Sequence, residues 1–158
     1  MIATWPPFLR RLLPGLWTGW LLCVALLATP APFATLAASD AGRVAGRMLA
    51  QDAYTGLGLG IAVLLLERMA ARRAADAAKG SQFSAEMALA LGALFCTVAG
   101  YFALQPAMAA ARSGQGALSF AQLHAISAVF FLVKIGCVLA LAARVARDPG
   151  SVSLAPSS

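Results

Sequence analysis

The sequence predicts an all-α integral membrane protein, a bundle of four spanning helices with both termini on the cytoplasmic side. Its composition, its charge-free runs and the placement of its basic residues support this. Of its 158 residues, 61% are hydrophobic and 11% are charged, with mean hydropathy +0.80. An ordinary globular chain carries roughly 25% charge. Because so little polar surface cannot coat a water-soluble particle, we expect the chain to lie in a lipid bilayer.

Four long runs without a charged residue define the predicted spans. They lie between Arg11 and Asp40, Asp52 and Glu67, Glu86 and Arg112, and Arg112 and Lys134. A helix needs about 20 mainly apolar residues to cross a bilayer. The predicted spans are residues 12–35, 47–69, 86–105 and 120–143. They form a transmembrane domain over residues 12–146, between a cytoplasmic tail, 1–11, and a disordered cytoplasmic tail, 147–158.

The first span has prolines at its end and basic residues at its start. Pro30 and Pro32 are expected to bend or end it. Arg10 and Arg11 before an apolar run are also typical of a signal peptide, whose cleavage would leave three helices. The apolar stretch is long for a signal peptide, so an uncleaved helix is the preferred interpretation.

The second span is too short unless it takes in residues before Asp52. On a helical wheel, Asp40, Arg43, Arg47, Gln51 and Tyr54 form a polar stripe. The opposite side carries a stripe of mostly small residues: Gly42, Gly46, Leu49, Ala53, Gly56 and Gly60. Residues 40–66 therefore fit one long helix or two abutting ones. A separate amphipathic helix over residues 40–52, lying in the membrane interface, fits equally well.

The third span is expected to end at Pro106, followed by a loop over residues 110–117 that contains Gly114 and Gly116.

The distribution of basic residues predicts the orientation of the chain in the membrane. The segments inside hold eight (Arg10, Arg11, Arg68, Arg72, Arg73, Lys79, Arg144 and Arg147), whereas those outside hold Arg43, Arg47 and Arg112. Because cytoplasmic loops are enriched in Lys and Arg, both termini are predicted to lie inside. The alanine- and arginine-rich usage suggests the inner membrane of a bacterium.

Polar residues near the outer ends of the second and fourth spans suggest a site. If these helices touch, Arg43, Arg47 and Gln51 meet His124 and Ser127. The functional interpretation is a vestibule for an anion or small polar solute, because ionisable groups in a membrane are functional candidates. A hydrogen-bond network that fixes helix register is the favoured alternative.

Lys134 is a charge inside the fourth span, where it needs a partner or must extend towards the interface. Glu86 is the nearest acidic candidate by depth, and extension of the lysine stem to the interface is slightly preferred.

Small residues at four-residue spacing allow helices to approach closely in lipid. The predicted packing positions are Gly42, Gly46, Gly56, Gly60, Gly92 and Gly100.

Catalytic motifs are missing from the sequence. It has no paired carboxylates at a site, no nucleophile elbow and no glycine-rich phosphate loop, so we expect no enzyme and no cofactor. Cys23, Cys96 and Cys137 lack compact metal-ligand spacing, and no metal site is expected. The basic residues lie at the edges of apolar runs rather than on one soluble face, which argues against nucleic-acid binding.

Short stretches of the chain resemble a known family. They are Ala31-Pro32-Phe33, Ala41-Gly42-Arg43-Val44-Ala45-Gly46 and Phe120-Ala121-Gln122-Leu123-His124-Ala125-Ile126-Ser127. These resemble the transmembrane-protein-205-like family, whose bacterial members carry domain of unknown function 4149. The resemblance covers residues 12–143 and implies a four-helix membrane protein without an established activity. Ala125 departs from the glycine expected there.

Two functions remain open on the sequence alone. The first is an uncharacterised inner-membrane protein for small-solute or ion permeation or tolerance, acting as an oligomer because one bundle leaves little room for a pathway. The second is a non-catalytic membrane subunit or assembly partner that docks other helices through its small-residue stripes. The expected partners are the lipid bilayer and either further copies of the chain or another membrane protein.

Overall fold

The computed structural model describes residues 5–77 and 83–147, with side chains from residue 7 onward, and all regular structure in these ranges is helical. Four helices are long and apolar enough to span a membrane: Pro7–Thr35, Ala38–Asp76, Ala85–Arg112 and Phe120–Arg147. The predicted all-α membrane bundle of four helices is confirmed at this level. Lys79 and the predicted tail from residue 148 onward lie outside the described residues.

The first span consists of three helical segments. α1 (Trp5–Cys23) continues into a π-helical turn, η1 (Val24–Ala28), and then into the short helix α2 (Ala31–Thr35). Pro30 and Pro32 lie at the start of α2, where a turn interrupts the helix of this span. α1 begins at Trp5, within the predicted cytoplasmic tail over residues 1–11, whose location stays a prediction.

The second span is one continuous helix, α3 (Ala38–Asp76), of 39 residues. At 1.5 Å per residue it is about 58 Å long, which excludes a separate interfacial helix over residues 40–52. Its predicted polar stripe is exposed throughout. Its buried positions include Ala45, Asp52, Gly56 and Val63, at alternating spacings of seven and four residues that place them on one face.

The third span also changes its helical form. α4 (Ala85–Thr97) begins at Ser84, whose hydroxyl accepts a hydrogen bond from the Met87 amide, and leads into the π-helical turn η2 (Val98–Ala103) and α5 (Gln105–Arg112). The prediction that Pro106 ends the span is wrong. Pro106 lies in the first turn of α5, where a missing amide hydrogen costs no helical hydrogen bond. Gly114, at φ 74°, then turns the chain towards α6 (Phe120–Arg147).

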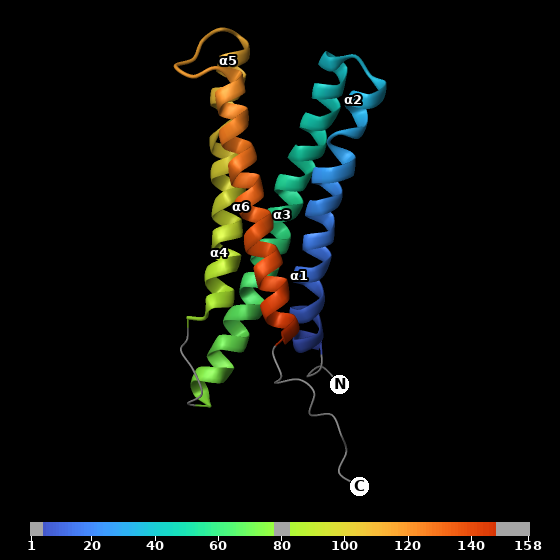
Figure 1. Ribbon diagram of the computed structural model, residues 1–158. Helices are drawn as coiled ribbons and strands as arrows, with labels where there is room; N and C mark the ends of the chain where they lie inside the picture. Colours follow the sequence, from blue (N-terminus) through green and yellow to red (C-terminus); the bar gives the residue numbers. More distant parts are fainter. Residues whose placement is uncertain (1–4, 78–82, 148–158) are drawn as a thin grey trace.

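The helices form a ring in which α1 contacts α3 and α6, and α4 contacts α3 and α6. Within the described residues, α3 and α6 lie on a diagonal without backbone contact. We call the end where α1 begins and α6 ends the basal end, and the end that carries α2 and α5 the distal end (Figure 1). Towards the distal end the ribbons separate into α2 with α3 and α5 with α6 (Figure 1).

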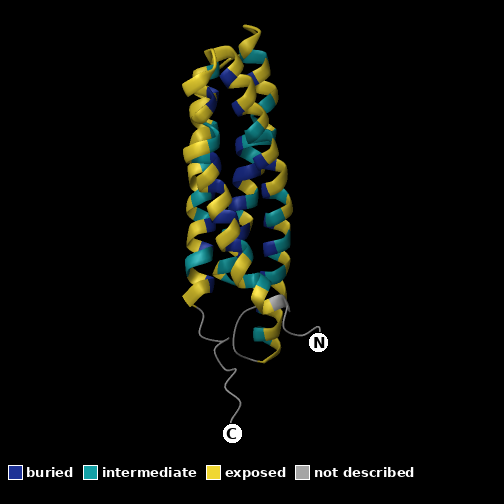
Figure 2. Cartoon of the chain, turned by 90° about the vertical axis from the view of Figure 1, so that its right-hand side faces the viewer, coloured by how far each residue is buried: buried dark blue, intermediate teal, exposed yellow. Residues whose placement is uncertain are grey.

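The apolar core lies in the basal half. It consists of Trp17, Leu21, Val63, Ala90, Ala93, Val138, Leu141 and Val145. Buried positions face inward along the bundle and exposed ones face outward (Figure 2). Large apolar side chains such as Leu26 and Leu132 are about two-thirds exposed, at 68% and 66%. In a membrane these positions face lipid, which explains an apolar exterior around an apolar core.

Four of the six glycines predicted to pack helices do face another helix, three of them at a close approach. A Cβ added at Gly60 would lie 2.6 Å from Leu94 Cδ2, and one at Gly100 would lie 2.5 Å from Phe130 Cβ. Gly92 faces Cys137 and Gly56 faces Thr97 at longer distances. Gly42 and Gly46 do not pack against another helix of the described chain, since they are exposed with no atom within 4 Å of an added Cβ.

Candidate functional site

A buried ion pair lies at the centre of the bundle. Lys134 Nζ lies 2.6 Å from Asp52 Oδ2, and the two side chains are 4% and 3% exposed. The indole Nε1 of Trp20 donates a hydrogen bond of 3.0 Å to the other carboxylate oxygen, Oδ1. The Lys134 ammonium also lies 4.6 Å from the centre of the Phe131 ring, within cation–π range. Both oxygens of Asp52 therefore have a donor.

All four spans contribute to this region. Trp20 comes from α1, Asp52 from α3, Thr97 from α4, and Lys134 and Ser127 from α6. We call these five residues the central polar site. The ion pair crosses the diagonal between α3 and α6, since the long lysine side chain bridges helices whose backbones do not touch. Asp52 occupies a core position of α3, four residues before Gly56, where a small neighbour leaves space for the ammonium.

A cavity of about 40 Å³ adjoins the ion pair. Its polar lining comes from Asp52, Lys134, Thr97, Tyr101 and Ser127. The Thr97 hydroxyl donates to the Ala93 carbonyl at 2.9 Å, and the Ser127 hydroxyl donates to the Gly100 carbonyl at 2.7 Å. Both hydroxyl oxygens thus keep lone pairs as acceptors. A cavity of this volume, with these polar groups in a largely apolar wall, has room for water or a small ion.

The π-helical turn η2 shapes one wall of this cavity. Gly100 lies in η2, and its carbonyl accepts the hydrogen bond from Ser127 on the neighbouring helix. A π-helical turn inserts an extra residue into a helix, and such turns occur frequently at functional sites. Gly100 also lets Phe130 approach the η2 backbone closely. The wall is therefore built by a local departure from α-helical geometry.

Asp52 and Lys134 are both buried, whereas each of the other ion pairs described here has at least one partly exposed side chain. Removing two charges from water costs several kcal/mol for each ion, and their attraction offsets this only with good geometry and further hydrogen bonds. Here the 2.6 Å contact, the Trp20 bond and the Phe131 ring supply that geometry. An apolar pair of similar volume is often equally stable or more stable. Stability alone therefore does not explain why charges occupy these positions.

Both predictions for Lys134 are wrong. Its side chain is buried rather than extended to the interface, and its partner is Asp52 rather than Glu86. Because α6 runs from Phe120 to Arg147, Lys134 lies near the middle of that helix, and the basal end is out of reach of its side chain. Glu86 lies at the basal end and pairs with Arg144 at 2.8 Å.

The predicted outer site does not form among the described residues. Arg43 pairs with Asp40 on its own helix at 2.8 Å, and Arg47 and Gln51 are exposed. His124 is exposed and stacks on Phe120, whose ring lies 4.6 Å from the Arg112 guanidinium carbon. The premise that the second and fourth spans pack side by side is wrong, since the backbones of α3 and α6 lie on a diagonal and do not contact each other. Only Ser127 of this set lines the central cavity.

Sequence reasoning missed Asp52 and Trp20 as site residues. A signal for Asp52 was present, because it lies within a predicted span and seven residues after Ala45, on the face that the small residues share. Glu67 fits the same face and is also buried, at 1% exposed, where it binds Arg10. No comparable signal marks Trp20, since tryptophan is ordinary in an apolar span.

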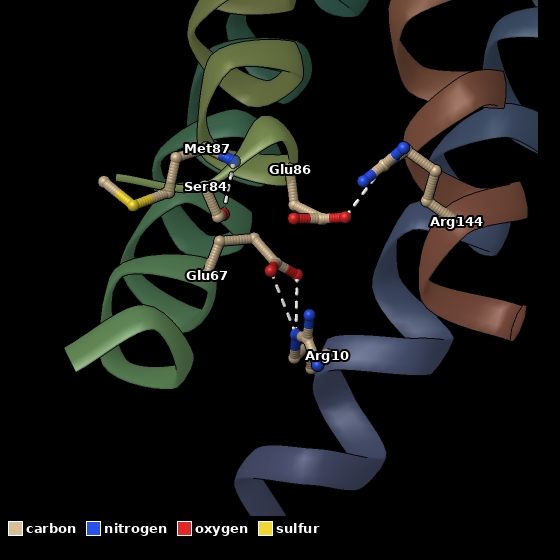
Figure 3. A network of polar contacts seen from close by, with 6 residues as sticks. All are labelled: Arg10, Glu67, Ser84, Glu86, Met87 and Arg144. Carbon is tan, nitrogen blue, oxygen red and sulfur yellow. Dashed lines mark hydrogen bonds and ion pairs between the residues drawn. The ribbon is translucent and has the colours of Figure 1, made fainter. Parts of the chain in front are cut away.

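At the basal end, ion pairs join the ends of the spans. Arg10 Nε contacts both carboxylate oxygens of Glu67, at 3.0 and 2.9 Å, and Arg144 Nε contacts Glu86 at 2.8 Å (Figure 3). These contacts link α1 to α3 and α6 to α4.

In the part of the chain that the structure describes, no group of three His, Cys, Asp or Glu residues is placed to hold a metal ion.

Comparison with known families places the chain. A family model described as a domain of unknown function, DUF4149, matches residues 12–117. The chain belongs to this family. The matched part of the DUF4149 chain includes Trp20, Asp52 and Thr97 and ends before Lys134. No curated protein and no solved structure matches the chain. Nothing in these comparisons supports the transmembrane-protein-205-like naming.

Proposed function

We propose that this DUF4149 protein mediates permeation of, or tolerance to, a small ion, and that the central polar site is its ion-binding centre. The observation that carries the proposal is the buried Asp52–Lys134 pair beside a cavity of about 40 Å³. An ionisable residue inside a membrane span is a functional candidate by default. The exposed residues Arg43, Arg47 and His124 do not belong to the proposed site.

The proposal includes an orientation in the inner membrane of a bacterium, with the basal end in the cytoplasm. Its support is the distribution of basic residues. In the described ranges, the basal end carries seven arginines (Arg10, Arg11, Arg68, Arg72, Arg73, Arg144 and Arg147). The distal end carries Arg43, Arg47 and Arg112. The positive-inside rule then orients the chain with α1 beginning, and α6 ending, inside.

Charge balance limits how the proposed site can bind an ion. The Asp52–Lys134 pair has no net charge, so adding a cation would leave an uncompensated charge in the membrane, which is costly. The site stays neutral if Lys134 releases a proton when a monovalent cation binds Asp52. The ammonium–carboxylate pair plus a cation then becomes a neutral amine, a carboxylate–cation pair and one free proton. We therefore propose an electroneutral exchange of a small monovalent cation for a proton.

Access to the site is proposed from the distal side. The cavity residues Leu49, Tyr101 and Ser127 lie on the distal side of Asp52, Thr97 and Lys134 in their own helices. On the basal side, the apolar core that includes Trp17, Val63 and Leu141 fills the bundle. A complete pathway therefore needs either a conformational change or contacts between copies, so an oligomer remains our prediction.

Reconstitution into liposomes with an internal pH-sensitive dye tests this proposal. An inward sodium or potassium gradient should raise the internal pH, because each cation that enters releases a proton from the vesicle. The double variant Asp52→Leu/Lys134→Met should abolish this change while the helical content stays the same. The matched control Glu86→Leu/Arg144→Met removes an ion pair at the basal end and should keep the exchange. Retained exchange in the Asp52→Leu/Lys134→Met variant would refute the proposal.

The alternative is a non-catalytic subunit or assembly partner, favoured by a separate observation. Gly15 and Gly19 on α1, and Gly42 and Gly46 on α3, repeat at four-residue spacing with nothing within 4 Å of an added Cβ. Such positions let a helix of another protein or another copy approach closely. A stoichiometric partner that co-purifies with the wild type but not with Gly42→Leu/Gly46→Leu would support this function. A strictly monomeric species in mild detergent would argue against it.

A further inference from the structure

A groove of about 460 Å³ opens at the basal end, between the start of α1, the start of α4 and the end of α6. Four charged residues line it: Arg10, Glu86, Arg144 and Arg147. Three arginines thus face one carboxylate. The apolar core of the basal half separates the groove from the central polar site. The groove is therefore a separate site from the one proposed for ion exchange.

Two of the three arginines are held in place by carboxylates. Arg10 is fixed through Nε by Glu67, a residue that is only 1% exposed, and Arg144 is fixed through Nε by Glu86 (Figure 3). A guanidinium has five N–H donors in a planar fork, so a contact through Nε does not exhaust it. The Arg144 side chain remains 53% exposed. Side chains ordered before a ligand arrives lose less entropy when it binds.

Arg147 supplies positive charge without a partner among the described residues. It lies one helical turn after Arg144 on α6, is exposed and lines the same groove. Because Glu67 and Glu86 compensate Arg10 and Arg144, the charge of Arg147 remains as the surplus of this cluster. A groove with a surplus positive charge and fixed guanidinium groups favours an anion.

We propose that this groove binds a phosphate group, with Arg144 and Arg147 as its donors and Arg10 as a further positive charge. The arginine fork matches two oxygens of a phosphate, and arginine is over-represented where such bidentate recognition matters. The groove lies at the ends of membrane spans, the depth at which lipid headgroups occur. Basic pockets between spanning helices bind anionic headgroups in this way. The phosphate therefore comes from an anionic phospholipid or from a free phosphate ion.

Binding of defined probes to the full chain in neutral detergent tests the site and separates the two sources. The probes are short-chain phosphatidylglycerol, short-chain phosphatidylcholine and inorganic phosphate, measured by thermophoresis. Arg147→Gln removes the uncompensated arginine and leaves both ion pairs in place. Arg73→Gln is the matched control, since it removes an exposed arginine at the same end that does not line the groove.

We expect phosphatidylglycerol to bind more tightly than phosphatidylcholine, and Arg147→Gln to weaken its binding about fivefold. Arg73→Gln should weaken it less than about twofold, and added salt should weaken it in every protein. Binding of inorganic phosphate with the same loss in Arg147→Gln identifies a free anion as a ligand, whereas binding of the lipid alone identifies the headgroup. The proposal would be overturned by equal losses of binding in Arg147→Gln and Arg73→Gln. It would also be overturned if neither phosphatidylglycerol nor inorganic phosphate bound.

Discussion

Among the described residues, α6 supplies the cation of two ion pairs, and these pairs differ mainly in how far they are exposed. Lys134 meets Asp52 at 2.6 Å, and Arg144 meets Glu86 at 2.8 Å. The side chains of the first pair are 4% and 3% exposed, whereas those of the second are 53% and 17% exposed. The first pair connects diagonal helices at mid-span, and the second connects neighbours at the basal end. Because of this difference in burial, we expect the two pairs to differ in free energy despite their similar distances.

The difference lies in what replaces a lost partner. Water can solvate a charge left at the basal end, which is why exposed ion pairs contribute about 0–1 kcal/mol. Neither water nor lipid can easily solvate a charge left at the central pair, and removing one partner of a buried pair costs about 3–5 kcal/mol. Variants of the two pairs therefore test whether burial, rather than the contact distance, determines how much each pair contributes to the free energy of unfolding.

The largest effect is expected from Lys134→Met. This variant should lower the free energy of unfolding by about 3–5 kcal/mol, because the Asp52 carboxylate loses its ammonium inside the bundle. Unfolding of the purified protein in mixed detergent and dodecyl sulfate micelles, followed by circular dichroism, measures this loss. The control is Val133→Met, at a half-exposed neighbouring position on α6. A surface substitution of this kind should cost about 0.5 kcal/mol or less. Similar losses in both variants would contradict a special role for the pair.

A smaller net effect is expected when both charges are removed. Asp52→Leu/Lys134→Met should unfold within about 1 kcal/mol of the wild type, since an apolar pair avoids the cost of burying charge. The four proteins of the double-mutant cycle should give a coupling free energy of at least about 2 kcal/mol. Additive losses from the two single variants would show that the residues act independently, which would break the comparison between the two pairs.

Trp20→Phe should have an intermediate effect. Phenylalanine keeps an aromatic ring but removes the indole N–H that donates to Asp52 Oδ1. Hydrogen bonds to charged groups contribute about 1.5–3 kcal/mol, so a loss of about 1–2 kcal/mol is expected in the same unfolding measurement. In the Asp52→Leu/Lys134→Met background the loss should largely disappear, because the acceptor is gone. A loss of the same size in both backgrounds would assign the effect of Trp20 to packing alone.

How far the sequence predicted the fold depended on the property in question. Charge-free runs predicted four spans because hydrocarbon excludes charge. They predicted the ends of the helices poorly. The helices α3 and α6 extend beyond their apolar regions through segments that contain arginines, and end at Asp76 and Arg147. Pro106 was misjudged because a proline breaks a helix interior and yet suits a first turn. Pro106 lies in a first turn because a new helical segment, α5, begins after η2. The sequence pattern did not predict η2.

The central site was predicted only in part, for a geometric reason. Lys134 was recognisable as a charge inside a span, but its partner depended on which helices are neighbours and which are diagonal. Sequence spacing gives the depth and face of a residue and does not give the order of helices around a bundle. The same missing information produced the predicted outer site, which placed His124 beside Arg43 and Arg47 although the backbones of α3 and α6 do not contact each other.

The smallest effect is expected from Arg144→Gln, at the basal pair. It should lower the free energy of unfolding by less than about 1 kcal/mol, because water replaces Glu86 around an exposed side chain. The loss should shrink further at high salt, which screens exposed charges. Unfolding in neutral detergent at low and high salt, without anionic lipid, measures both properties. A loss as large as that of Lys134→Met, and unchanged by salt, would mean that the basal pair is shielded from water. Since its side chains are 53% and 17% exposed in a single chain, such shielding requires another copy or a partner protein over the basal end.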